Sequence, residues 1–111
     1  SLDSSYVASQ LNTAIDNYIL TDLNPIVDRV KKTGDHNKTG VALVRAKRYK
    51  EAKAEFSKVN SIAALNNIAN IYTIEQDYDN AMKTYQKVLA ADPENKNAQT
   101  GLENLKNKLG L

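Results

Sequence analysis

The sequence predicts an all-α fold, a solenoid of antiparallel helix pairs with about seven helices in one domain of 111 residues. One spacing of small, large and aromatic residues occurs twice, 29 residues apart, as Gly40-x2-Leu43-x5-Tyr49-x2-Ala52-x3-Phe56-x2-Val59 and Ala69-x2-Tyr72-x5-Tyr78-x2-Ala81-x3-Tyr85-x2-Val88. Two prolines and four glycines leave long uninterrupted stretches that favour helices, and no segment alternates with the period of a strand. A repeated helical pair cannot bury its apolar face alone, so it stacks on its neighbours.

The N-terminal third of the chain is expected to be a helical pair or a cap, over residues 4–33. Residues 4–20 predict an amphipathic helix, because apolar residues recur there at helical spacing: Val7, Leu11, Ala14, Ile15 and Tyr18. A short helix follows from Asn24-Pro25, an N-cap with proline at the first helical position, to the C-terminal signal Gly34. Its apolar residues are expected to face inward: Ile26, Val27 and Val30.

Four further helices are expected at about 37–47, 50–59, 62–75 and 79–91. The first two meet at a bend at Arg48-Tyr49. Ser61 is placed to cap the third helix. Asp92-Pro93 ends the fourth, because proline cannot continue the hydrogen-bond ladder and restricts the residue before it.

The final helix, at about 95–109, carries its apolar residues on one narrow stripe: Ala98, Leu102, Leu105 and Leu109. Its other faces carry Asn, Gln, Lys and Glu side chains. A helix that is polar on three sides is expected to close the end of a stack.

Two motifs in residues 62–95 carry a family resemblance. The first is Leu65-x2-Ile68-Ala69-x2-Tyr72, and the second is Tyr78-x2-Ala81-x3-Tyr85-x2-Val88 followed by Asp92-Pro93. They resemble the two helices and the closing proline of a tetratricopeptide repeat (TPR), and the segment has the 34-residue length of that repeat. The resemblance implies a right-handed α-solenoid whose concave groove binds other proteins.

On this resemblance the chain is interpreted as one TPR-like domain over residues 1–111. Its parts are expected to be the N-terminal pair or cap at 4–33, a shortened repeat at 34–61, a full repeat at 62–95 and a capping helix at 96–111. The shortened repeat lacks the closing Asp-Pro and is five residues shorter, which predicts a tighter connection to the next unit.

The resemblance also implies where a partner binds, because the first helix of each TPR pair lines the groove. Amide side chains there can both donate to and accept from a peptide backbone. Helix 62–75 is expected to contribute Asn66, Asn67, Asn70 and Ile74. The preceding unit is expected to contribute Asn37, Val41 and Arg45, and the last helix Asn104 and Lys108. Arg45 and Lys108 are candidate anchors for an acidic group. The alternative for the amides is a solvated polar face in a chain with thirteen asparagines.

Two other functions remain open from the sequence. In a self-associating scaffold, apolar residues of the 4–20 helix (Tyr6, Ile19 and Leu20) make a subunit contact and a homo-oligomer forms. Alternatively, the segment 29–58, with ten bases against three acids, binds an acidic partner or nucleic acid. Glu51 and Glu55 interleave with the bases, which argues against nucleic acid and allows ion pairs within the domain.

Several kinds of chemistry are not expected. The absence of cysteine excludes disulfides, thiolate metal sites and cysteine nucleophiles. His36, the only histidine, stands in a turn without a second ligand or nucleophile at a telling spacing. We therefore expect no enzymatic activity, no cofactor and no metal. No apolar run reaches the roughly 18 residues of a membrane span, no signal peptide is recognised, and cytoplasmic and periplasmic locations both fit.

Overall fold

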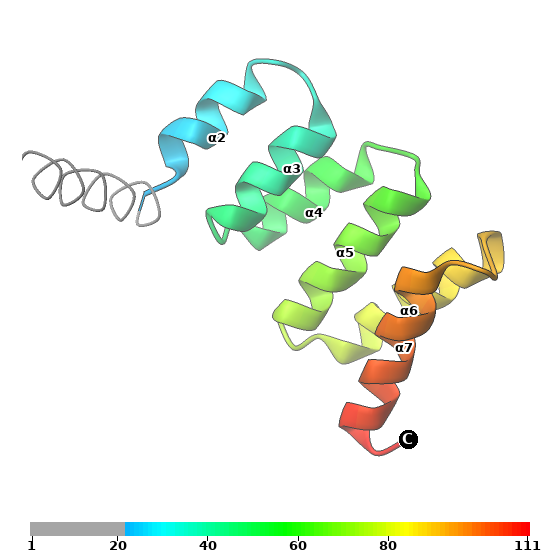
Figure 1. Ribbon diagram of the computed structural model, residues 1–111. Helices are drawn as coiled ribbons and strands as arrows, with labels where there is room; N and C mark the ends of the chain where they lie inside the picture. Colours follow the sequence, from blue (N-terminus) through cyan, green and yellow to red (C-terminus); the bar gives the residue numbers. More distant parts are fainter. Residues whose placement is uncertain (1–21) are drawn as a thin grey trace, which may run out of the picture.

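The computed structural model describes residues 22–111, and over this range the chain is all-helical. Six helices follow one another: α2 (Asn24–Lys31), α3 (His36–Arg45), α4 (Tyr49–Ser57), α5 (Ile62–Ile74), α6 (Tyr78–Ala91) and α7 (Lys96–Leu109). Each packs against the next, and α7 also contacts α5 (Figure 1). The all-α prediction is confirmed for this range, while the helix predicted at 4–20 lies outside the described residues.

Side-chain caps fix where several helices begin. Ser61 accepts a hydrogen bond from the backbone N–H of Ala64 at the start of α5, as predicted. Asp35 does the same at α3, Asp77 at α6 and Asn95 at α7. The predicted ends are correct to within about two residues, since α3 ends at Arg45 and α6 ends just before Asp92-Pro93.

The two helix pairs α3–α4 and α5–α6 reverse direction through the same turn. Lys47 and Gln76, 29 residues apart, both adopt left-handed backbone conformations with φ of 61° and 63°. The next N–H after each donates back into the preceding helix, from Arg48 to the carbonyl of Leu43 and from Asp77 to the carbonyl of Tyr72, at 2.8 Å in both cases. The structural repeat therefore extends into the turn. The bend expected at Arg48-Tyr49 is a reversal of direction over residues 46–48.

The core consists of two adjoining clusters. The cluster between α2 and α5 is built on Val27, Leu43, Phe56, Ile68 and Ile71, each at most 9% exposed. The cluster between α5 and α7 is built on Ala69, Ala81, Tyr85, Val88 and Leu105. Tyr72 packs against both, so the core is continuous along the stack.

Candidate functional site

Two hollows open on the surface of residues 22–111, and we name them by the helices that flank them. The α2–α3 hollow has a volume of about 960 Å³ and is lined by Leu23, Ile26, Val30, Asn37, Lys38, Val41, Ala42, Arg45, Lys47 and Asn67. The α5–α7 hollow has a volume of about 600 Å³ and is lined by Asn70, Thr73, Tyr85, Lys96, Asn97, Thr100, Gly101, Asn104, Leu105 and Lys108. Asn67 and Asn70 lie three residues apart on one side of α5, so the hollows adjoin.

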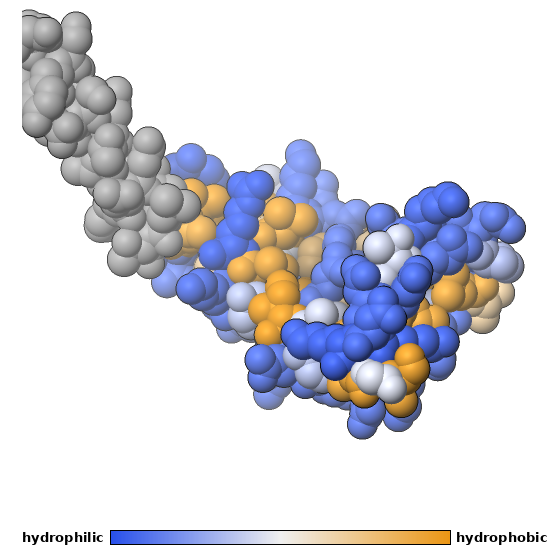
Figure 2. Space-filling view, turned by 60° about the horizontal axis from the view of Figure 1, so that its bottom comes forward, coloured by the Kyte–Doolittle hydropathy of each residue, from blue (hydrophilic) through white to orange (hydrophobic). Residues whose placement is uncertain are grey.

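The α2–α3 hollow combines exposed apolar side chains with basic ones. Val41 is 43% exposed and Ile26 is 36% exposed, so burial in the core does not account for them. The prediction that Ile26 faces inward is wrong, since the buried residue on α2 is its neighbour Val27. Figure 2 shows hydrophobic residues reaching the surface between hydrophilic ones at the end of the molecule where α2 lies, and again further along.

The charge around the α2–α3 hollow has one sign. Lys38, Arg45 and Lys47 line it, and none of its lining residues is acidic. Within residues 22–111 no ion pair engages these three bases, whereas Arg48, Lys53 and Lys58 pair with carboxylates elsewhere. An apolar surface with a basic rim is complementary to an amphipathic, acidic chain.

The α5–α7 hollow is more polar. Its lining brings together three asparagines, two threonines and two lysines. The phenol of Tyr85 donates a hydrogen bond to Asn70 Oδ1 at 2.5 Å, and burial raises the pKa of Tyr85 above its ordinary value. Lys108 Nζ lies 5.1 Å from the centre of the Tyr78 ring, within range of a cation–π interaction.

The structure divides the predicted partner-binding residues among three environments. The α2–α3 hollow gathers Asn37, Val41, Arg45 and Asn67. The α5–α7 hollow gathers Asn70, Asn104 and Lys108. Asn66 and Ile74 line neither hollow.

Asn66 lies inside the packed part of the molecule rather than on the open face expected from the sequence. It is 6% exposed, and its Nδ2 donates to Oδ1 of Asn95, the N-cap residue of α7, at 3.2 Å. The physical reason is that the start of α7 lies against this side of α5. Ile74, at the last turn of α5, is 53% exposed and stands apart from both hollows.

Sequence reasoning missed the contribution of α2 to the first hollow and of the first turns of α7 to the second. On α2 the spacing of Ile26 and Val30 indicates an apolar face but does not say whether another helix covers it. On α7, Lys96, Asn97 and Thr100 are polar residues on a helix that is polar on three sides, and nothing in the pattern distinguishes them.

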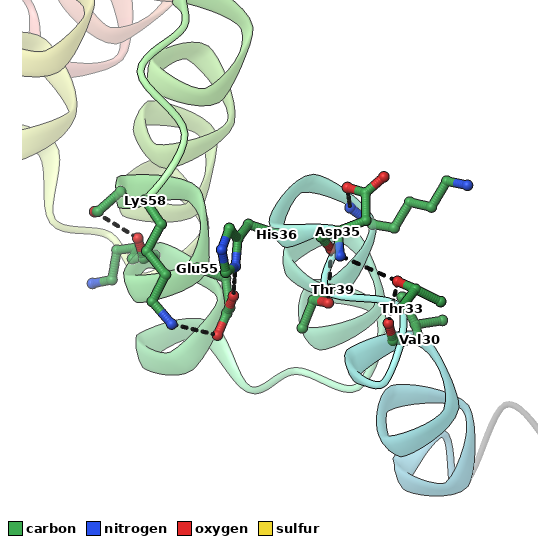
Figure 3. A network of polar contacts seen from close by, with 10 residues as sticks. Val30, Thr33, Asp35, His36, Thr39, Glu55 and Lys58 are labelled. Carbon is green, nitrogen blue, oxygen red and sulfur yellow. Dashed lines mark hydrogen bonds and ion pairs between the residues drawn. The ribbon is translucent and has the colours of Figure 1, made fainter.

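His36 belongs to a polar network that ties α3 to α4 (Figure 3). Its Nδ1 lies 2.8 Å from Glu55 Oε2, and Lys58 donates to Glu55 Oε1 at 3.1 Å. No group of three potential metal ligands occurs within residues 22–111. The arrangement is that of a structural link between two helices.

Removing the Glu55 carboxylate should lower stability in a pH-dependent way. The hydrogen bond from His36 lowers the pKa of Glu55 below its ordinary 4.5, aided by Lys58 and opposed by burial. A carboxyl whose folded-state pKa is depressed stabilises the fold above the unfolded-state pKa, and this contribution is lost as pH falls through the folded-state pKa. In urea titrations, Glu55→Gln should therefore be less stable than the native chain at pH 7, by less than about 1 kcal/mol, with the difference closing towards pH 3. Glu51→Gln, at a surface pair with Arg48, is the matched control. A pH-independent difference for Glu55→Gln would contradict this account.

The stacked helix pairs with their repeated turn define a helical-repeat protein. The tetratricopeptide repeat family model matches residues 62–95, which are α5, α6 and the loop that follows. This segment is a tetratricopeptide repeat, as the sequence predicted. Repeats of this family generally mediate protein–protein interaction and are generally non-catalytic. A search of curated proteins finds no match to the chain. None of the described helices is long and apolar enough to span a membrane.

Proposed function

We propose that this chain is a non-catalytic interaction module that binds a peptide or helix of a partner protein along the two adjoining hollows. The observation that carries the proposal is the α2–α3 hollow, in which exposed apolar side chains lie beside three bases and no acid. An exposed apolar surface with polar borders is typical of a binding site for another protein.

In this proposal the α2–α3 hollow supplies most of the affinity. Val41 and Ile26 take up apolar side chains of the partner, because burial of that surface releases water from both. Arg45 binds a carboxylate of the partner, with two parallel hydrogen bonds where the geometry allows. Asn37 and Asn67 hydrogen-bond to polar groups of the partner.

The α5–α7 hollow then extends the contact along the same side of α5. Asn70 holds its position through the Tyr85 phenol, which leaves less side-chain entropy to lose on binding. Asn104 and Lys108, both exposed on α7, contribute an amide and a positive charge. Asn66 is not part of this surface, because its amide is buried against Asn95.

A charge-reversing variant of the α2–α3 hollow tests the proposal. Val41→Asp/Arg45→Glu puts two acids where the native hollow is apolar and basic, so recovery of specific partners from a lysate, quantified by mass spectrometry, should fall at least tenfold. The matched control is Ile74→Asp/Lys50→Glu, which makes the same changes at exposed positions outside both hollows. Partners retained by the native chain and the control but lost by the hollow variant support the proposal. Equal retention by a folded hollow variant would refute it.

The two alternatives are weaker. Self-association through Tyr6, Ile19 and Leu20 falls on residues outside the described range and stays a prediction, to be tested by the molecular mass at increasing concentration. Binding of nucleic acid through segment 29–58 is disfavoured, since three of its bases are engaged in ion pairs with Glu51, Glu55 and Glu75.

A further inference from the structure

We propose that the α2–α3 hollow is occupied by residues 4–20 of the same chain, which a partner must displace. This inference rests on the proposed function in one respect, because it concerns the same hollow. The proposal adds a segment of the same chain that competes with the partner for the hollow. Such a segment would cover the apolar surface of the hollow while no partner is bound.

The hollow lies directly beside the point where the N-terminal segment joins the described chain. Leu23, one of its lining residues, immediately precedes α2 and is three residues from Leu20. A chain spans at most about 3.3–3.6 Å per residue, so the end of segment 4–20 lies within roughly 10 Å of the wall of the hollow.

The chemistry of segment 4–20 complements that of the hollow. Its apolar residues Val7, Leu11, Ala14, Ile15 and Tyr18 recur at helical spacing, so they can present one apolar face. The apolar surface available to such a face includes Ile26 and Val41, at 36% and 43% exposure.

Charge complements the apolar match. Segment 4–20 contains one acid, Asp16, and no base, and a second acid, Asp3, directly precedes it. The hollow offers Lys38, Arg45 and Lys47 without an acid. Opposite charges favour the docking of segment 4–20 in the hollow and disfavour the docking of basic segments.

Tethering favours the internal occupant over a second copy of the chain. A binding segment on a short linker acts at an effective concentration of the order of millimolar, which exceeds the concentration of a free chain in most conditions. An external partner can then bind only those chains whose hollow is open. Its apparent affinity is the intrinsic affinity multiplied by the fraction of such chains.

The chain has no cysteine, so one nitroxide spin label can be attached at a single engineered site. The label is placed by Thr13→Cys, a polar position of the segment, in the full-length 15N-labelled protein. Docking in cis is expected to broaden the amide signals of Val41 and Arg45 while leaving those of Thr100 and Asn104, in the α5–α7 hollow, sharp. The baseline from tethering alone is measured in Thr13→Cys with Leu11→Asp and Ile15→Asp added, where the broadening at Val41 and Arg45 should fall at least several-fold.

A mixed sample separates the two possible sources of the segment. Spin-labelled chains without 15N are mixed with 15N-labelled chains without a spin label, so that only contacts between molecules are detected. Sharp signals in the mixture together with broadening in the single-chain sample support docking in cis. Broadening of Val41 and Arg45 in the mixture would instead assign the hollow to a second copy and overturn the proposal. Equal broadening with and without the two aspartates would also overturn it.

This test needs no partner, so its result is independent of the proposed function. If both proposals hold, Leu11→Asp/Ile15→Asp should also retain several-fold more partner than the native chain in the lysate experiment. Docking in cis without any effect of Val41→Asp/Arg45→Glu on partner recovery would leave the internal contact established and refute the partner-binding role of the hollow.

Discussion

Phe56→Ala is expected to lower the free energy of unfolding by about 3–5 kcal/mol, because it empties the largest fully buried site of the described chain. Phe56 is 1% exposed, and its ring packs against the backbone of Gly40. A Cβ atom added at Gly40 would lie 2.7 Å from Phe56 Cε1, so the helices approach this closely only because residue 40 has no side chain.

The change is measured by urea denaturation followed by far-UV circular dichroism. Ile74→Ala is the control, since it removes an apolar side chain that is 53% exposed and should change stability by less than about 0.5 kcal/mol. If Phe56→Ala leaves too little folded protein to measure, Phe56→Leu provides a milder variant of the same site. A loss below about 1 kcal/mol for Phe56→Ala would contradict the packing described.

The damage should also be uneven along the stack. Repeat proteins are stabilised by contacts between neighbouring units, so a cavity weakens its own layer most. Phe56 belongs to the cluster between α2 and α5, which meets the cluster between α5 and α7 through Tyr72. Hydrogen exchange in Phe56→Ala should therefore accelerate in α3 and α4 before it does in α6 and α7.

Much of the fold could be predicted because its determinants are local. Ser61 caps α5 through a bond three residues along the chain, and Pro93 acts on the residue before it, so neither needs knowledge of distant segments. The repeated spacing then indicates which helices pair. The left-handed turns at Lys47 and Gln76 were not predicted, because neither residue type signals a positive φ, and their common cause is the geometry of the reversal.

The candidate site was harder to predict, because it depends on which helix covers which face. Asn66 and Asn67 are adjacent in the sequence and fall on the same broad polar arc of α5. The structure buries Asn66 against Asn95 and leaves Asn67 at the α2–α3 hollow. A helical projection gives the direction of a side chain but not the path of a later segment, here the start of α7. The same limit explains why Ile26 was expected in the core.

Asn95→Ala is expected to cost about 2–4 kcal/mol, because one amide serves two helices. Asn95 Oδ1 accepts from the backbone N–H of Ala98 at 3.0 Å, which caps α7, and from Nδ2 of the buried Asn66 at 3.2 Å. Its own Nδ2 donates to Asp92 Oδ2 at 3.2 Å. Loss of an N-cap costs about 1 kcal/mol, and a buried amide left without a partner costs about 1–3 kcal/mol.

The two contributions can be separated with variants at the same positions. Asn95→Ser keeps an N-cap oxygen but shortens the side chain. Its loss of stability should therefore come mainly from the lost hydrogen bond to the buried Asn66 amide. Asn66→Ala removes the buried amide, whose Oδ1 has no hydrogen-bond partner among the described residues. Each variant is compared with the native chain by urea denaturation.

The double variant Asn66→Ala/Asn95→Ala tests whether Asn95 acts only as the N-cap of α7 or also as a hydrogen-bond partner of the buried Asn66. If Asn95 satisfies Asn66, removing both amides leaves no buried group unpaired, and the double variant should be more stable than the sum of the single effects by about 1 kcal/mol or more. A coupling near zero would mean that the Asn66 amide finds water once Asn95 is gone. Asn95 would then act as a helix cap alone, and the burial of Asn66 would follow from packing around α5 and α7 rather than from this hydrogen bond.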